Sequence, residues 1–221
     1  MKAMVIMMEK KKVLLIGDSI RMGYDKYVKN YLADSCEVYY PKDNCRFAQY
    51  TLRHLSDWKS GFNGDDLDLI HWNVGLWDTL ELYDDGCLTP PEFYAFFIEK
   101  ICKRIKVLFP KAKVIFATST PVIESRFTEP HFSRRLNSNV KKYNNIAVEI
   151  CKKHGFAVND LYSLVENVPE EYYSDMTHLY TPEGTQLLTD AVIKAICDTL
   201  DIEYREFTLA DYESVKEVIG L

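Results

Sequence analysis

Three short segments of this 221-residue chain carry side chains suited to acyl transfer. Ser19 follows the apolar run 12–16 at a predicted strand-to-helix turn, where its hydroxyl and the N–H groups of the oncoming helix face the same way. Near the other end of the chain, Asp175 and His178 share one turn, in which the carboxylate can hold the imidazole ready to accept a proton from a hydroxyl. Taken alone, each segment has a simpler explanation. Ser19 or Asp18 can cap the helix, and His178 can be an exposed histidine in a loop.

The third segment ends the predicted strand 67–73 with Asn73, whose amide can donate to a developing oxyanion. A buried asparagine that pairs with loop backbone explains the same segment equally well. Because ligands gather at the carboxyl ends of parallel strands, we expect all three segments to meet at one edge of a sheet. Their coincidence at one edge favours acyl transfer.

The elements that must position these residues alternate along the chain. Apolar runs predict strands at 12–16, 36–40, 67–73, 113–118 and 156–158, and helical periodicity predicts helices at 22–32, 47–58, 90–108, 133–154 and 182–200. In helix 90–108, Phe93 and Phe96 are expected to face the core. This order predicts an α/β fold, a three-layer α/β/α sandwich around a parallel sheet.

The size and composition of the chain predict one domain over residues 1–221. Its core spans 12–200, and a C-terminal extension follows at 201–221 with a short helix at 209–218. This extension either covers the sheet edge or packs on a second subunit, so a homo-oligomer is possible.

The residues Gly17-Asp18-Ser19 after the first strand and Asp175-Met176-Thr177-His178 near the C-terminus resemble the SGNH/GDSL hydrolase superfamily of serine esterases and acylhydrolases. The resemblance covers residues 12 to about 200. It implies a flavodoxin-like sandwich with Ser19 as the nucleophile, His178 as the general base and acid, and Asp175 as the residue that orients the imidazole.

The chain departs from the family's third motif, which usually reads Gly-x-Asn-Asp. Residues 75–78 are Gly-Leu-Trp-Asp, so Trp77 occupies the position of the asparagine that donates to the oxyanion. Asn73 lies four residues earlier, on the same side of an extended strand. We therefore predict that Asn73 replaces the missing amide.

A second departure is the lack of a glycine in 43–48, where the family has a glycine whose backbone N–H binds the oxyanion. Cys45, Arg46 and Phe47 are the alternatives for this donor, and we predict Arg46. A surface arginine that pairs with nearby acidic residues is the more common explanation for Arg46. The predicted oxyanion hole therefore consists of the Ser19 N–H, a backbone N–H at Arg46, and Asn73.

Charge and composition restrict the partners. The formal net charge of −6 disfavours nucleic acid, and the apolar runs are too short to span a membrane. We see no signal peptide, and six cysteines without a C-x-x-C pair indicate free thiols in the cytoplasm. We expect neither a metal nor an organic cofactor.

These observations predict an esterase with a small-molecule ester substrate and a Ser-His-Asp triad. The polar loop 78–89 favours a small acyl group, such as acetyl, on a carbohydrate-like carrier. Trp72, Trp77 and Tyr180 are candidates to stack on a sugar ring, although aromatic residues near strand ends are more often part of the core. Two alternatives stay open: an O-acyltransferase with the same triad, and a non-catalytic binding module that lost an oxyanion donor at Trp77.

Overall fold

The computed structural model describes residues 9–62, 66–129 and 133–220. Five parallel strands form its main sheet, in the order β2-β1-β3-β5-β7. Their bounds are β1 (Lys11–Ile16), β2 (Cys36–Tyr39), β3 (Leu69–Trp72), β5 (Lys113–Ala117) and β7 (Ala157–Asn159). The helices are α1 (Ser19–Tyr31), α2 (Ala48–Gly61), α3 (Pro91–Leu108), α4 (Asn137–Lys153), α5 (Leu161–Val165), α6 (Pro182–Leu200) and α7 (Leu209–Ile219).

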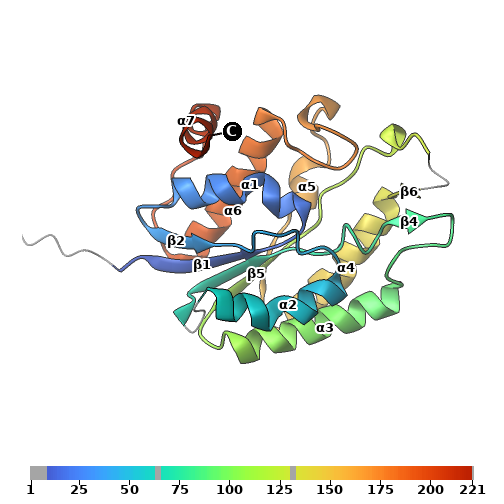
Figure 1. Ribbon diagram of the computed structural model, residues 1–221, viewed down its shortest axis with the longest axis horizontal. Helices are drawn as coiled ribbons and strands as arrows, with labels where there is room; N and C mark the ends of the chain where they lie inside the picture. Colours follow the sequence, from blue (N-terminus) through green and yellow to red (C-terminus); the bar gives the residue numbers. More distant parts are fainter. Residues whose placement is uncertain (1–8, 63–65, 130–132, 221) are drawn as a thin grey trace, which may run out of the picture.

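Helices cover both faces of the sheet. Figure 1 shows α1, α6 and α7 above it and α2, α3 and α4 below it, and each group packs within itself. This arrangement confirms the predicted three-layer α/β/α sandwich. All connections between parallel neighbours therefore cross over a face of the sheet, which keeps every strand carboxyl end at the same edge.

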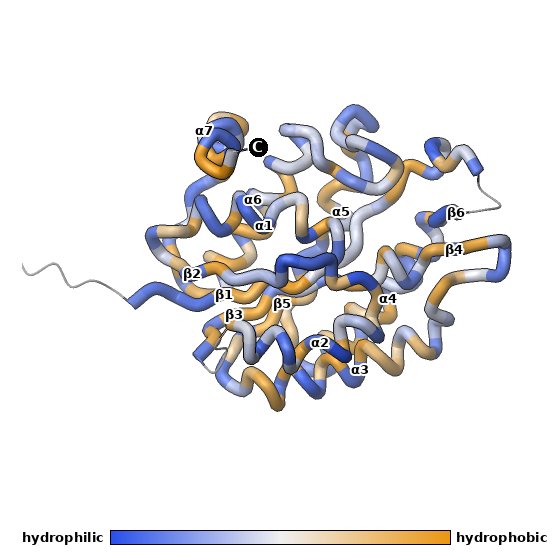
Figure 2. The backbone as a smooth tube through the Cα atoms, in the orientation of Figure 1, coloured by the Kyte–Doolittle hydropathy of each residue, from blue (hydrophilic) through white to orange (hydrophobic). Residues whose placement is uncertain are grey.

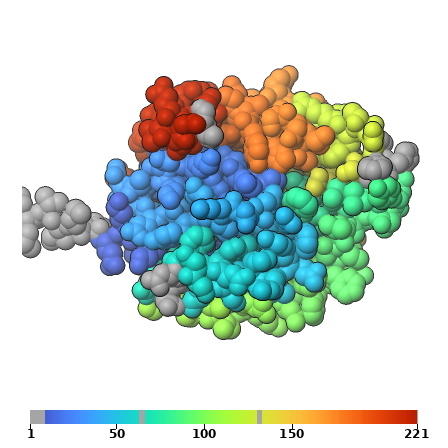
Figure 3. All heavy atoms as spheres, viewed as in Figure 1, coloured from blue at the N-terminus to red at the C-terminus, as the bar shows by residue number. Residues whose placement is uncertain are grey.

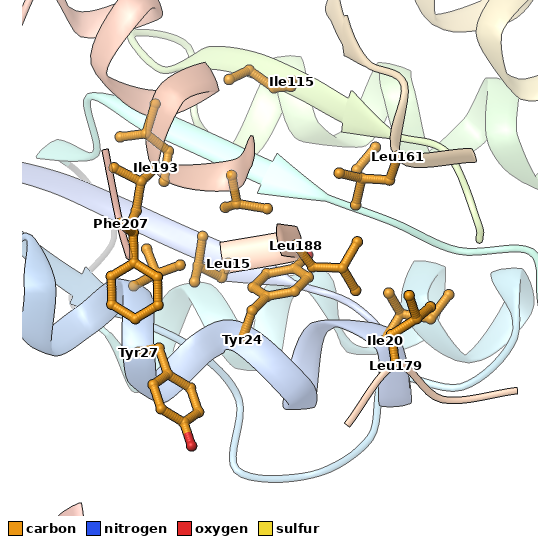
Figure 4. Packing of buried hydrophobic residues seen from close by; sticks show 14 of the residues in the cluster. Leu15, Ile20, Tyr24, Tyr27, Ile115, Leu161, Leu179, Leu188, Ile193 and Phe207 are labelled. Carbon is orange, nitrogen blue, oxygen red and sulfur yellow. The ribbon is translucent and has the colours of Figure 1, made fainter. Parts of the chain in front are cut away.

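The central apolar runs form strands because both sides of β1, β3 and β5 are buried along most of their length. In β1, Val13 and Leu15 belong to the core under α1 and α6, whereas Leu14 and Ile16 belong to the core under α2 and α3. Figure 2 shows the central strands as a hydrophobic band, and Figure 4 shows how side chains from α1, α6 and the sheet fill the first of these cores. The turn after β1 is thus attached to a rigid base.

The polar loop 78–89 contains a strand that the sequence did not predict. β4 (Glu81–Leu82) pairs antiparallel with β6 (Ser133–Arg134), and Arg134 Nε lies 2.7 Å from a Glu81 carboxylate oxygen. The predicted helix at 133–154 accordingly begins later, because residues 133 and 134 are extended in this pairing. The two short strands lie beyond the carboxyl ends of the main sheet (Figure 1).

The prediction for the buried face of α3 is wrong at two positions. Phe93 is 55% exposed and Phe96 50% exposed, while Tyr94, Ile98 and Ile101 are fully buried. The helix buries the stripe Tyr94-Ile98-Ile101 against α2 and α4, which turns the two phenylalanines toward solvent.

The C-terminal extension packs on its own chain. α7 lies against α1 and α6, with the Tyr212 ring stacked on Tyr27 at a centroid distance of 5.0 Å. Phe207, which precedes α7, is fully buried and also contacts Tyr27 and Tyr31 edge-on. In Figure 3 the C-terminal helix rests directly on the N-terminal part of the molecule. The segment thus packs on helices of the same molecule and not on the sheet edge, which was one of the two predicted alternatives.

Two further properties bear on function. No helix in residues 9–62, 66–129 or 133–220 is long and apolar enough to cross a membrane. All six cysteines are free thiols, as the sequence predicts.

Candidate active site

The candidate site lies where the strand order reverses, between β1 and β3, at the carboxyl ends of these strands. Ser19 is the first residue of α1, directly after β1, and Asn73 directly follows β3. The helix cap is Asp18, whose carboxylate accepts the Ile20 N–H at 2.9 Å. Because Asp18 caps the helix, the Ser19 hydroxyl is left for other contacts.

The structure brings Ser19, His178 and Asp175 together, although 159 residues separate the first two. His178 Nε2 lies 2.7 Å from Ser19 Oγ, and His178 Nδ1 lies 2.6 Å from Asp175 Oδ2. These distances form a continuous hydrogen-bonded chain from carboxylate to imidazole to hydroxyl. Such a chain can pass a proton from the hydroxyl to the imidazole while the carboxylate holds the ring.

Asp175 is held by more than the imidazole. Its Oδ1 accepts the backbone N–H groups of Thr177 and His178, at 2.6 and 2.8 Å, and the Thr177 hydroxyl at 3.0 Å. Partial burial acts to raise the pKa of Asp175, but the hydrogen bonds from His178 and Thr177 outweigh it and hold the pKa below its usual value. The carboxylate is therefore ionised and fixed in one orientation.

The loop that carries Asp175 and His178 is tied to the segment after β5, which the sequence predicted as a long loop. The Ile123 N–H donates to the Met176 carbonyl at 2.9 Å. Arg126 Nη1 donates to the carbonyls of Tyr173 and Asp175, at 3.3 and 3.0 Å, and its Nη2 donates to Glu170. The sequence reasoning missed Arg126, because nothing local to residue 126 marks a partner so distant in the chain.

Tyr180 lies beside the candidate site, as the sequence predicts. Its ring lies against the His178 imidazole, with the centroids 4.6 Å apart and the planes tilted by 31°, and its hydroxyl donates to the Ser19 carbonyl. Trp72 is a core residue, the alternative to sugar stacking, because its side chain is fully buried against Phe116 and cannot reach a substrate.

Asn73 does not present its amide at the surface. Solvent does not reach the side chain, and Nδ2 donates to Asp18 Oδ1 at 2.9 Å. Burial raises the pKa of Asp18, although the bonds from Asn73 and Ile20 oppose this rise. The geometry therefore favours a structural Asn73 that supports the cap of α1, and it does not support the predicted oxyanion role.

The loop after β2 lies against the Ser19 turn, because the Cys45 N–H donates to the Gly17 carbonyl at 3.1 Å. Arg46 has φ +52°, the left-handed region that favours glycine, and its N–H donates to Asn44 Oδ1 at 2.8 Å. Its guanidinium is exposed and lies over the Tyr50 ring. Arg46 therefore lacks the free N–H that the predicted oxyanion role requires. Its positive φ is a backbone conformation that glycine, the family's residue in this segment, adopts without strain.

Asp78 ends the unusual third motif and lies under this same loop. It is fully buried and accepts the Ala48 N–H at the start of α2, at 3.1 and 3.2 Å from its two oxygens. Burial raises the pKa of Asp78 to about 7. The carboxyl thus fixes the first turn of α2 relative to the residues after β3.

No group of three or more histidine, cysteine, aspartate or glutamate side chains within the described residues is arranged to hold a metal ion. The candidate site consists of side chains that can carry out acyl transfer by themselves.

No protein-family model matches the sequence. The chain is 32% identical over 199 residues to a human protein described as "Isoamyl acetate-hydrolyzing esterase 1 homolog", a match that covers 80% of this chain and 77% of that protein. Among solved structures, a lipase/acylhydrolase from Enterococcus faecalis superposes with a TM-score of 0.69 and 20% identity, covering 88% of this chain and 98% of the other. An acetyl xylan esterase from Geobacillus stearothermophilus superposes with a TM-score of 0.64 and 15% identity, covering 88% and 97%.

The sequence relative and the fold together define an esterase or acylhydrolase with a small-molecule ester substrate. The chain belongs to the SGNH/GDSL hydrolase superfamily.

Proposed function

We propose that this protein is a serine esterase that releases small acyl groups, with acetyl preferred, from a carbohydrate-like or other small alcohol. The observation that carries the proposal is the hydrogen-bonded chain from Asp175 through His178 to Ser19. If the Gly-Asp-Ser turn only capped the helix, the hydrogen bonds from Ser19 to His178 and from His178 to Asp175 would have no purpose, because the Asp18 carboxylate alone caps α1.

In the proposed reaction, Ser19 Oγ attacks the ester carbonyl carbon while its proton passes to His178 Nε2. The tetrahedral intermediate collapses, the bond to the alcohol oxygen breaks, and His178 returns the proton to that oxygen. Water then attacks the acyl-enzyme with the same base and releases the acid. Asp175 stays ionised throughout and stabilises the imidazolium.

The proposed backbone donors to the oxyanion are the N–H groups of Ser19 and Phe47. Within the described part of the chain, neither N–H has a hydrogen-bond partner, whereas those of Cys45, Arg46 and Ala48 do. The Cys45 bond to Gly17 brings the Phe47 loop alongside the Ser19 turn.

The names of the relatives support the acyl group. Isoamyl acetate and acetylated xylan are both acetate esters, and they differ widely in the alcohol. A small acyl group also fits a site in which Tyr180 covers one side of His178. The carbohydrate carrier rests on the likeness to acetyl xylan esterases and on the polar segment 78–89.

The test uses purified protein and the Ser19→Ala variant. We expect a fluorophosphonate probe to label the wild type and not the variant, and kcat on an acetate ester to fall at least about 10³-fold in the variant. Acetyl, butyryl and octanoyl esters of one alcohol are then compared. Labelling that persists in Ser19→Ala would reject the nucleophile, and faster release of octanoyl than of acetyl would reject the small-acyl preference.

A further inference from the structure

Arg135 has a position that the proposed triad leaves unexplained. It follows β6 and precedes α4, and its Nε donates to the Leu76 carbonyl at 2.6 Å. Leu76 belongs to the turn after β3, directly before Trp77. The pairing of β6 with β4 holds this part of the chain at the carboxyl edge of the sheet.

The guanidinium is half-buried beside the candidate site and has free donors. Its charge acts on two carboxyls, that of Asp18 before the proposed nucleophile and that of Asp175 in the triad. Among the described residues, however, it forms no ion pair within 4.0 Å, and its Nη1 and Nη2 donate to nothing. Burial lowers the pKa of Arg135, while the two carboxyls oppose this effect. The Nη groups of this half-buried cation are therefore available to a ligand.

The proposed reaction also needs hydrogen-bond donors to the oxyanion. A tetrahedral intermediate carries a full negative charge on the former carbonyl oxygen, and donors to this oxygen supply much of the catalysis in acyl transfer. No amide from the third motif serves here, because the Asn73 amide bonds to Asp18 and residue 77 is a tryptophan where the family has asparagine. The two backbone N–H groups proposed above carry no charge.

We propose that Arg135 is a further catalytic residue, whose Nη groups donate to the oxyanion of the tetrahedral intermediate. This inference rests on the proposed Ser19 chemistry. As Ser19 Oγ bonds to the carbonyl carbon and its proton moves to His178, the π electron pair of the C=O bond moves to the oxygen, which the guanidinium then stabilises. The charge of the cation balances the charge that develops there, and the bond to Leu76 keeps the guanidinium oriented beforehand.

The test compares Arg135→Gln and Arg135→Lys with Arg134→Gln, a matched control in which the neighbouring arginine loses its ion pair with Glu81. The substrate is a neutral acetate ester, and a hemisuccinate ester of the same alcohol is run in parallel. For Arg135→Gln we expect kcat on the acetate to fall about 10²- to 10³-fold with little change in KM. The kcat of Arg135→Lys should fall less than that of Arg135→Gln. Millimolar guanidinium chloride should restore part of the kcat of Arg135→Gln. Urea unfolding of each variant confirms that it is folded.

A wild-type kcat in Arg135→Gln overturns the inference while leaving the esterase proposal standing. A loss confined to the hemisuccinate and to KM also overturns it, because the guanidinium would then bind a substituent of the substrate. If Arg135→Gln does not fold, the Arg135→Lys variant tests the inference instead. An unchanged kcat in Arg135→Lys overturns it, because lysine lacks the planar guanidinium that the proposed bonds to the oxyanion require. Wild-type protein without Ser19-dependent turnover would instead reject the proposed function.

Discussion

At the scale of single residues, Tyr180 and Gly23 depend on each other. A Cβ at position 23 would lie 2.6 Å from the Tyr180 ring, so the glycine allows the ring to lie over the first turn of α1. There the ring packs against His178, and its hydroxyl donates to the Ser19 carbonyl. Gly23 therefore sets the position of the Tyr180 ring at the candidate site.

We predict that Gly23→Ala displaces Tyr180 and lowers kcat about tenfold or more, because a misplaced imidazole slows proton transfer. Gly61→Ala is the control, since it is the same change in a helix with nothing within 4 Å, and it should leave kcat unchanged and raise stability by about 0.5 to 1 kcal/mol. Kinetics with an acetate ester and urea unfolding measure both effects. Equal kcat in the two variants would contradict the role of Tyr180.

Asp78 makes the stability of the protein depend on pH. Its folded-state pKa of about 7 lies above the value near 4 of an unfolded aspartate, so the folded state binds the proton more tightly. Below about pH 4 both states are protonated. As pH rises from about 4 to about 7, the contribution of Asp78 to the free energy of unfolding falls by up to about 1.4 kcal/mol per unit, and above about 7 it is constant.

We predict that Asp78→Asn, which mimics the protonated form, removes this slope. Relative to the variant, the wild type should lose about 2 kcal/mol between about pH 5 and about pH 8. Urea unfolding at several pH values measures the difference, with the exposed Asp34→Asn variant as control. Parallel pH curves for wild type and Asp78→Asn would show that burial does not raise this pKa.

At the scale of elements, the segment after β5 acts as a clamp on the loop that carries Asp175 and His178. Arg126 satisfies three carbonyls there, those of Tyr173, Asp175 and Glu170. A guanidinium can reach several acceptors at once because its donors form a planar fork, which a lysine ammonium lacks.

We predict that Arg126→Lys loosens this loop and lowers kcat about 3- to 30-fold, while KM changes little. Amide hydrogen exchange should quicken at residues 173–178 and stay unchanged in β1. The control is Arg53→Lys, an exposed arginine paired with Asp57 one turn away on α2. Unchanged exchange at 173–178 in Arg126→Lys would refute the clamp.

The elements also show which local patterns are reliable. The five parallel strands and the long helices α1, α2, α3, α4 and α6 were predicted within a few residues. Buried strands leave continuous apolar runs, and burial of one helix face leaves a helical period. β4 and β6 were missed, since two residues cannot show a period and their pairing joins positions more than 50 residues apart. Phe93 and Phe96 were misassigned because an aromatic side chain alone does not say which stripe of α3 is buried.

At the scale of the whole molecule, the C-terminal extension completes the core over α1. Phe207 is fully buried among Tyr27, Tyr31 and the residues around them, and Figure 4 shows its ring beside Ile193. Gln186 and Asp190 of α6 also bond to the backbone at Phe207. The extension thus ties the first and the last helices of the sandwich together.

We predict that Phe207→Ala lowers the free energy of unfolding by about 3 to 5 kcal/mol, because a buried ring is lost and a cavity is left. Val218→Ala, at a position 74% exposed, is the control and should change stability by less than about 0.5 kcal/mol. Urea unfolding measures both. A loss under about 1 kcal/mol in Phe207→Ala would mean that the extension is not part of the cooperative core.

The sequence by itself determined the alternation of strands and helices, and with it the sandwich and the sheet edge at which Ser19, Asp175 and His178 meet. These features follow from local periodicity and from residues adjacent to strand ends, so they are visible without a structure. Only the tertiary structure decided that the Asn73 amide bonds to Asp18, that Arg46 turns the loop after β2, that Arg126 binds the Asp175 carbonyl, and that Arg135 binds the Leu76 carbonyl. Each of these depends on a hydrogen bond or a turn whose outcome is set by packing between distant elements, and a buried donor takes whichever acceptor that packing brings within reach.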